Sequence, residues 1–137
     1  MTRTKRGPSP PDPALVRPRR SACAVASTLD IVGDRWTLLV IRDLLAGKSR
    51  YSEFLASAEK IPSNILADRL KRLEREELIE SSLYSEHPPR SEYHLTAEGE
   101  ELGWAVDALA TWGLRHFPGS VRMIPSPDDL DTAQRQT

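Results

Sequence analysis

A segment near the middle of the chain has apolar positions at the spacing of an amphipathic helix. Leu66, Leu70 and Leu73 recur every three or four residues and share one face of a 3.6-residue helix. Ser63 and Asn64 stand at its start, where their side chains can satisfy free backbone amides. The other faces carry basic and polar side chains of the kinds that bind phosphates and base edges. The pattern predicts a helix with one anchoring face and one face suited to either solvent or DNA.

The residues before this helix predict a second, shorter helix. Residues 51–58 place Phe54 and Leu55 on an inward side, and residues 59–62, which include a proline, separate the two helices. Two helices joined by a short turn form a helix-turn-helix, the unit whose second helix enters the major groove of DNA. We therefore interpret the helix that begins at Ser63 as a recognition helix.

The residues after the recognition helix predict two strands, over residues 77–84 and 91–96, joined as a hairpin. Alternation is clearest in the second strand, where Tyr93 and Leu95 share a face. Two consecutive prolines stiffen the tip, and Arg90 lies where an exposed tip would meet a phosphate or the minor groove. A hairpin that follows a helix-turn-helix is the wing of a winged helix. The predicted fold class is therefore mainly α with a small β-hairpin wing.

Two further helices are predicted before the helix-turn-helix. Residues 22–30 form the first, Gly33 breaks it, and Asp34 is suited to cap the second. The second helix is apolar nearly all round, which indicates burial on several sides, and Gly47 suits the left-handed residue that ends a helix. A tryptophan inside so apolar a helix is usually part of the core, so we interpret Trp36 as structural.

After the wing, Thr96 is suited to cap a long helix over residues 97–116. Its apolar positions form two stripes, one of Leu102, Val106, Leu109 and Gly113 and the other of Trp104, Ala108 and Trp112. A small domain needs one stripe to cover its core, so the second stripe indicates a partner, most simply a symmetric second copy. We expect a dimer through the terminal helices. Its contacts are expected from Leu102, Val106, Leu109 and Trp112.

Length and composition fit one small domain with flexible ends. The chain has 137 residues, a formal net charge of −1 and one cysteine, so it has no global basic field and no intramolecular disulfide. Residues 1–20 predict a flexible, basic, proline-rich arm, residues 21–117 the winged helix-turn-helix domain, and residues 118–137 a mobile acidic tail. The arm is either a solvated leader or a source of salt-sensitive attraction to phosphates.

The sequence offers no pattern for catalysis. It contains no Gly-rich phosphate loop and no nucleophile elbow, and Cys23 and the three histidines do not have the spacing of metal ligands. We therefore expect no enzymatic activity, no cofactor and no metal. Because no apolar run is long enough to span a bilayer, we also expect no membrane partner and a cytoplasmic location.

Several pieces of sequence, in a fixed order, carry a family resemblance. They are Cys23, residues 33–44 (GDRWTLLVIRDL), residues 50–54 (RYSEF), residues 88–96 (PPRSEYHLT) and Gly99. With this order and spacing, the chain resembles the HxlR-type branch of the MarR-like winged helix-turn-helix transcriptional regulators, from about residue 23 to about residue 117. The resemblance implies a dimer whose terminal helices form the interface.

The chain departs from the pattern of that family at three places. Ala24 follows the cysteine where the family often has proline, Asp34 and Arg35 stand where it often has glycine and lysine, and Glu77 stands where a glycine commonly ends the recognition helix. These departures bear on ligand or redox behaviour more than on the fold.

A dimer of this kind would place two recognition helices in successive major grooves, roughly 34 Å apart, on an inverted-repeat operator. We expect base contacts from Ser63, Asn64 and Arg69, with Asn64 pairing with adenine and Arg69 with guanine. Phosphate contacts are expected from Lys48, Arg50, Lys71, Arg72 and, at the wing, Arg90. The alternative for the helix arginines is local pairing, in which Arg69 or Arg72 binds Asp68 or Glu76.

Cys23 is the candidate sensor. The resemblance implies a role in sensing electrophiles or oxidants, because some members carry such a cysteine, and the nearby Arg19 and Arg20 favour the reactive thiolate. The alternative is a small, buried, apolar residue.

The expected partners are double-stranded DNA, a second copy of the chain, and a small-molecule or oxidant effector. An aromatic pocket near Trp36, Tyr51 or Trp104 would hold a small molecule. Repression is the expected sign of regulation, because nothing resembles an activation domain and a dimer on a promoter blocks it by occupancy. The rival interpretation is a winged-helix module that binds protein through its apolar terminal helix and has no specific DNA site.

Overall fold

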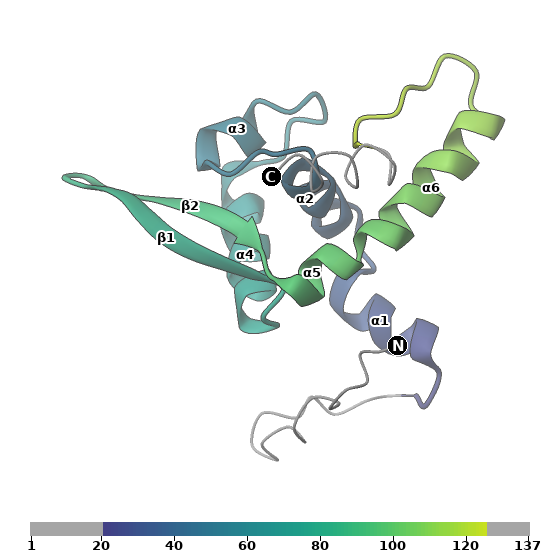
Figure 1. Cartoon of the computed structure of the whole chain (residues 1–137), viewed down its shortest axis with the longest axis horizontal. Helices are drawn as coiled ribbons and strands as arrows, with labels where there is room; N and C mark the ends of the chain where they lie inside the picture. The colour runs from purple at the N-terminus through teal and green to yellow at the C-terminus, as the bar shows by residue number, and fades with distance from the viewer. Residues whose placement is uncertain (1–20, 126–137) are drawn as a thin grey trace, which may run out of the picture. The chain divides into compact units, whose positions relative to one another are not determined.

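A computed structural model of the chain describes residues 21–125, so the basic arm and most of the acidic tail lie outside the described residues. The chain divides into two compact units, residues 1–31 and 32–137. Helix α1 (Ala24–Val32) lies almost entirely in the first unit and begins and ends two residues later than expected. All other elements belong to the second unit, which is mostly helical with a two-stranded antiparallel hairpin (Figure 1).

Helix α2 (Arg35–Leu45) begins and ends as the sequence predicts. The side chain of Asp34 caps it by accepting a hydrogen bond from the amide of Thr37 at 2.9 Å. Gly47, which follows the end of the helix, has a φ of 99°, the positive value that a glycine tolerates. The core-facing side of α2 is buried at Val40, Ile41, Leu44 and Thr37. Trp36 is half-buried, and the Arg35 guanidinium lies 5.1 Å from the centre of its ring.

Helices α3 (Tyr51–Leu55) and α4 (Ser63–Arg75) form the predicted helix-turn-helix. The predicted leucine stripe of α4 is confirmed, because Leu66, Leu70 and Leu73 are all at most 2% exposed. Burial of each such side chain contributes about 2 kcal/mol of hydrophobic stabilisation. Helix α3 is three residues shorter than expected. Beyond its end the chain turns, and the buried hydroxyl of Ser57 donates to Asp43.

Strands β1 (Ile79–Glu86) and β2 (Pro89–Leu95) pair antiparallel, with Ile79 opposite Leu95 at the base and Glu86 opposite Pro89 near the tip. The strands reach further toward the tip than expected, and a bulge interrupts the register between Leu83 and Ser85. The second proline, Pro89, is the first residue of β2, a position that a two-stranded sheet tolerates because each strand is an edge. The hairpin extends away from the helices of its unit as a wing (Figure 1).

The long terminal helix that the sequence predicts is in fact two helices, α5 (Ala97–Glu101) and α6 (Gly103–His116), separated at Leu102. The predicted cap is correct, because the Thr96 hydroxyl accepts a hydrogen bond from the amide of Gly99 at 3.1 Å. The same hydroxyl donates to the carbonyl of Glu77. Helix α5 thus follows the base of the wing and contacts β2, whereas α6 packs against α2.

Candidate nucleic-acid interface

Helix α4 has one face that is turned away from the core. Asn64, Asp68, Lys71 and Arg75 follow one another at three- and four-residue spacing, opposite the buried leucine stripe, and all four are exposed. Asn64, Lys71 and Arg75 make no hydrogen bond or ion pair through their side chains with any other residue of the range 21–125. This face, defined by these four residues and called the outer face of α4 below, presents one amide and two cationic groups to solvent, together with the carboxylate of Asp68.

The start of α4 is held by the helix before it. The hydroxyl of Tyr51 donates to the carbonyl oxygen of Ser63 at 2.6 Å and lies 2.8 Å from its Oγ. Ser63 is exposed at the first turn of α4, beside Asn64. Ser63 and Asn64, two of the three residues predicted to contact bases, therefore both lie in the first turn of α4.

Arg69 and Arg72 do not belong to the outer face. Arg69 donates through Nε to Oδ1 of Asp34 at 3.1 Å, and Arg72 donates through a terminal nitrogen to Oδ2 of Asp34 at 3.4 Å. Arg69 also pairs with Asp68 at 2.5 Å, as the alternative interpretation of the sequence expected. The pairing with Asp34, a residue far away in the sequence, was not expected.

Lys48 takes part in a buried polar network at the end of α2. Its ammonium donates to Oγ of Ser57 at 2.7 Å, and Ser57 in turn donates to Oδ2 of Asp43, which is 5% exposed. The charge of Lys48 lies 3.8 Å from the same carboxylate. This network gives Lys48 a structural partner where the sequence suggested only a phosphate contact.

Next to this network, Arg42 holds the turn of the helix-turn-helix. It makes two hydrogen bonds to the carboxylate of Glu59, at 2.8 and 2.9 Å, and two more to Asp43. These hydrogen bonds lower the pKa of Glu59 to about 2 and raise the pKa of Arg42. A bidentate ion pair therefore fixes the turn that sets the position of α4 relative to α2.

Arg50 connects the helix-turn-helix to the wing. Its Nε donates to Glu92 in β2 at 3.0 Å, and its guanidinium lies 3.8 Å from the ring centre of Tyr84 in β1. Arg50 also stands before α3, where its amide donates to the carboxylate of Glu53. The side chain is 47% exposed, so it keeps one side open to a phosphate while it orients the wing.

Arg90 lies near the free end of the wing. It is exposed, and no other residue in the described part of the chain binds its side chain. Together with the outer face of α4, it gives the winged helix two separate cationic elements, one at the recognition helix and one at the hairpin tip. This is the arrangement in which a helix reads the major groove and a wing contacts the flanking backbone or minor groove.

The comparison with protein families decides the identity of this winged helix. The family model described as HxlR-like helix-turn-helix matches residues 31–120. The chain belongs to this family. The HxlR-like chain is 35% identical over 94 residues to the uncharacterized HTH-type transcriptional regulator YdeP of Bacillus subtilis, a match that covers 69% of this chain and 73% of that protein. It is 38% identical over 95 residues to the uncharacterized HTH-type transcriptional regulator Rv3095 of Mycobacterium tuberculosis, a match that covers 69% of this chain and 60% of that protein.

Solved structures agree with this assignment. The redox regulator HypR in its reduced form superposes with a TM-score of 0.65 at 29% identity, over 70% of this chain and 95% of that one. The diamide-treated YodB of B. subtilis superposes with a TM-score of 0.55 at 30% identity, over 69% of this chain and 94% of that one. The HxlR-like chain is thus a winged helix-turn-helix transcriptional regulator of the DNA-binding class.

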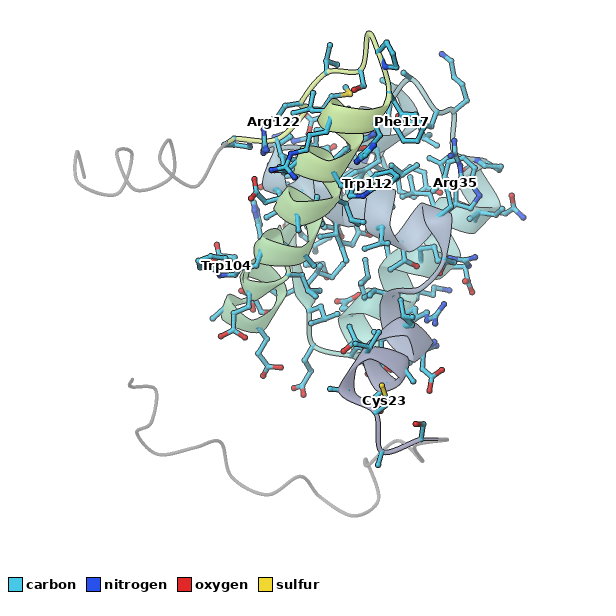
Figure 2. The ribbon with its side chains drawn as sticks, turned by 90° about the vertical axis from the view of Figure 1, so that its right-hand side faces the viewer. Cys23, Arg35, Trp104, Trp112, Phe117 and Arg122 are labelled. Carbon is cyan, nitrogen blue, oxygen red and sulfur yellow. The ribbon has the colours of Figure 1, made fainter. Side chains whose placement is uncertain are left out.

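In this HxlR-like regulator, helix α6 has an inner and an outer side. Val106 is 7% exposed and belongs to the core of the chain, and Leu102 is half-buried. Leu109 and Trp112 are 57% and 55% exposed, and Trp104, the most exposed large apolar side chain of residues 21–125, projects from the helix at 78% (Figure 2). The predicted second stripe, with Trp104 and Trp112, is therefore uncovered in the single chain. The first stripe is divided, because Val106 belongs to the core and Leu109 is exposed.

Cys23 precedes α1 in the first unit, and its side chain is exposed (Figure 2). The alternative that Cys23 is a buried apolar residue is therefore wrong. Arg19 and Arg20, which were expected to favour the thiolate, lie outside the described residues.

Arg75 was not among the DNA contacts predicted from the sequence. Its spacing could have indicated it, because Arg75 follows Lys71 by four residues and so falls on the same side of the helix, opposite the leucines. Over residues 21–125, no three metal-binding side chains are grouped, and no helix there is long and apolar enough to cross a membrane.

Proposed function

We propose that this HxlR-like regulator is a cytoplasmic repressor that binds an inverted-repeat operator as a homodimer. The observation that carries the proposal is the outer face of α4, where Asn64, Lys71 and Arg75 are exposed without a side-chain partner among the described residues. Two such helices related by a two-fold axis would enter successive major grooves, with half-sites about 34 Å apart. A dimer bound over a promoter would block transcription by occupancy.

In this proposal, the residues of the interface divide into two groups. Asn64 and Ser63 read base edges, with Asn64 offering the bidentate amide that suits adenine. Lys71, Arg75 and Arg90 bind phosphates, which position the protein without specifying sequence. Arg50 adds a phosphate contact while its guanidinium remains stacked on the ring of Tyr84. Lys48, Arg69 and Arg72 contribute less direct contact than their charges suggest, because each is held by a carboxylate.

The dimer is assigned to the exposed apolar side of α6. Leu109 and Trp112, with Trp104 beside them, form an apolar surface that water would otherwise contact. Val106 supports this surface from within the protomer, and Leu102 lies at its edge. A symmetric second copy would cover the same surface on both chains.

We further propose that oxidation of Cys23 lowers operator affinity. The thiol is exposed and therefore accessible to an oxidant. Support by similarity comes from HypR, known in a reduced and an oxidized form, and from YodB, whose structure was solved after diamide treatment.

The exposed apolar side of α6 also favours a second candidate function, a protein-binding winged helix without a specific DNA site. Selection of genomic DNA fragments by the purified protein, with and without diamide, separates the two. Enrichment of one inverted repeat with half-sites about one turn apart supports the repressor, and loss of that enrichment with diamide supports the role of Cys23. The absence of any enriched motif at moderate salt would favour the protein-binding module.

A further inference from the structure

Asp34 lies where the start of α2 meets the recognition helix α4. It precedes α2, and its two carboxylate oxygens each accept one hydrogen bond from Thr37 and one from an arginine of α4. Oδ1 accepts from the amide of Thr37 and from Arg69, and Oδ2 accepts from the hydroxyl of Thr37, at 2.7 Å, and from Arg72. One side chain thus caps α2 and anchors the recognition helix.

Both arginines donate to Asp34, and Arg69 also keeps its ion pair with Asp68 of the outer face. The side chains of Arg69 and Arg72 are 21% and 27% exposed, although arginines on a helix that faces DNA would be expected to extend into solvent. Burial of Asp34 favours the uncharged acid, but the hydrogen bonds from Thr37 and Arg69 outweigh it and lower the pKa of Asp34 below its usual value. The carboxylate is therefore charged at neutral pH and neutralises cationic groups on α4.

We infer that Asp34 is a specificity-determining residue for DNA binding, which fixes the orientation of α4 and withholds Arg69 and Arg72 from the phosphate backbone. This inference rests on the proposed function. Phosphate contacts add affinity for any sequence, whereas base contacts discriminate. A regulator that keeps two guanidinium groups on an internal carboxylate therefore gives up non-specific affinity and holds the base-reading residues Ser63 and Asn64 in one position.

The substitution Asp34→Asn isolates this role. Asparagine caps helices about as well as aspartate and can still accept from the amide of Thr37, so the cap persists. Its neutral amide cannot bind two guanidinium groups. The matched control is Asp107→Asn, because Asp107 also pairs with an arginine, Arg122, at 2.6 Å and lies on α6, so the change in charge is the same away from α4.

The measured quantity is the ratio of affinities for the selected operator and for a scrambled duplex of equal length, over a salt series. We expect Asp34→Asn to lower this ratio by about 5- to 10-fold. Binding to the scrambled duplex should become stronger, with a salt slope steeper by about one for each released guanidinium that reaches a phosphate. Asp107→Asn should leave the ratio unchanged. An unchanged ratio for Asp34→Asn, or an equal loss for Asp107→Asn, overturns the inference.

The variant Arg69→Gln tests whether Asp34 acts on the affinity ratio through Arg69, and it leaves the cap of α2 intact. If Arg69 released from Asp34 binds phosphates, adding Arg69→Gln to Asp34→Asn weakens binding to the scrambled duplex and restores part of the lost ratio. If the double variant has the same ratio as Asp34→Asn or a lower one, Asp34 does not act through Arg69 and the inference is wrong. If the wild-type protein binds the operator and the scrambled duplex equally, the proposed function fails together with this inference. If the wild-type protein and the Asp34→Asn variant prefer the operator to the same degree, only this inference fails.

Discussion

The backbone of Leu78 passes so close to Gly99 that no side chain fits between them: a Cβ at Gly99 would lie 2.1 Å from the carbonyl oxygen of Leu78. That carbonyl already accepts a hydrogen bond from the amide of Thr96 at 3.0 Å. The close approach joins the start of the wing to α5 and explains why a glycine belongs at this place in the motif.

The first prediction concerns this contact. Gly99→Ala should lower the free energy of unfolding by about 3 kcal/mol, because the backbone of either α5 or the wing must move. Urea denaturation measures this change in the free energy of unfolding. Gly113→Ala is the matched control in α6, where the nearest atom would be in Phe117 at 3.8 Å and the higher helix propensity of alanine should stabilise by about 1 kcal/mol. Equal effects at the two glycines would show that the close contact has no energetic consequence.

The second prediction concerns Glu77, which has a φ of 61° directly after α4. A left-handed conformation costs a residue other than glycine about 1 kcal/mol, and this is the position where the family commonly has glycine. Glu77→Gly should therefore stabilise the protein by about 1 kcal/mol in urea denaturation. Glu80→Gly, in strand β1, should destabilise it by a similar amount. A loss of stability with Glu77→Gly would contradict the strain that we infer from the backbone.

The third prediction concerns acid stability. The pKa of Glu59 is lowered by Arg42 from 4.5 to about 2, so the ion pair stabilises the folded state above about pH 4.5 and loses its contribution as the pH falls toward 2. Since the Glu59 side chain is 24% exposed and partly screened, we expect a contribution of about 2 kcal/mol. Glu59→Gln should reduce the steepness of the fall in stability between pH 4.5 and 2. The control Glu80→Gln, at an exposed position, should keep the wild-type steepness, and equal profiles for wild type and Glu59→Gln would refute the effect.

The fourth prediction concerns the outer face of α4. Asn64→Ala should weaken binding to the selected operator by about 1 to 3 kcal/mol and leave binding to random DNA nearly unchanged. Arg75→Ala should weaken both and reduce the salt slope by about one, as expected for a phosphate contact. Fluorescence anisotropy with both duplexes over a salt series distinguishes these effects. If Asn64→Ala weakens binding to both duplexes equally, its assignment to base reading is wrong.

The fifth prediction concerns the thiol. Diamide should reduce operator binding by the wild-type protein and leave Cys23→Ser unaffected, because serine keeps the size of the side chain and removes its redox chemistry. A gel-shift titration with and without diamide, followed by reduction with dithiothreitol, measures the effect and its reversal. A Cys23→Ser variant that still responds to diamide would remove Cys23 from the mechanism, since the sequence contains no other cysteine.

Most of the fold could be predicted from local patterns in the sequence. The leucine stripe of α4, the cap at Asp34 and the cap at Thr96 each depend on residues a few positions apart, and the structure shows all three. The break at Leu102 was missed because the apolar pattern continues through it. That break follows from where the wing and α2 lie, which a local pattern does not contain.

The candidate site was less predictable for a related physical reason. Arg69 and Arg72 looked like contacts for DNA because their partner Asp34 is more than thirty residues away in the sequence. Arg50 likewise meets Tyr84 and Glu92 only after the wing has folded back beside α3. Charge and spacing identify which side chains can bind a phosphate, but only tertiary structure shows which of them already have an internal partner.

Two copies of this regulator are proposed to read one operator through paired recognition helices. Hydroxyl-radical footprinting on the selected operator, combined with the mass of the complex by analytical ultracentrifugation, measures both the number of copies and their spacing. We expect two protomers per operator and two protected patches separated by about one helical turn. A single protomer with one protected patch, or protection that does not depend on Asn64 and Arg75, would contradict it.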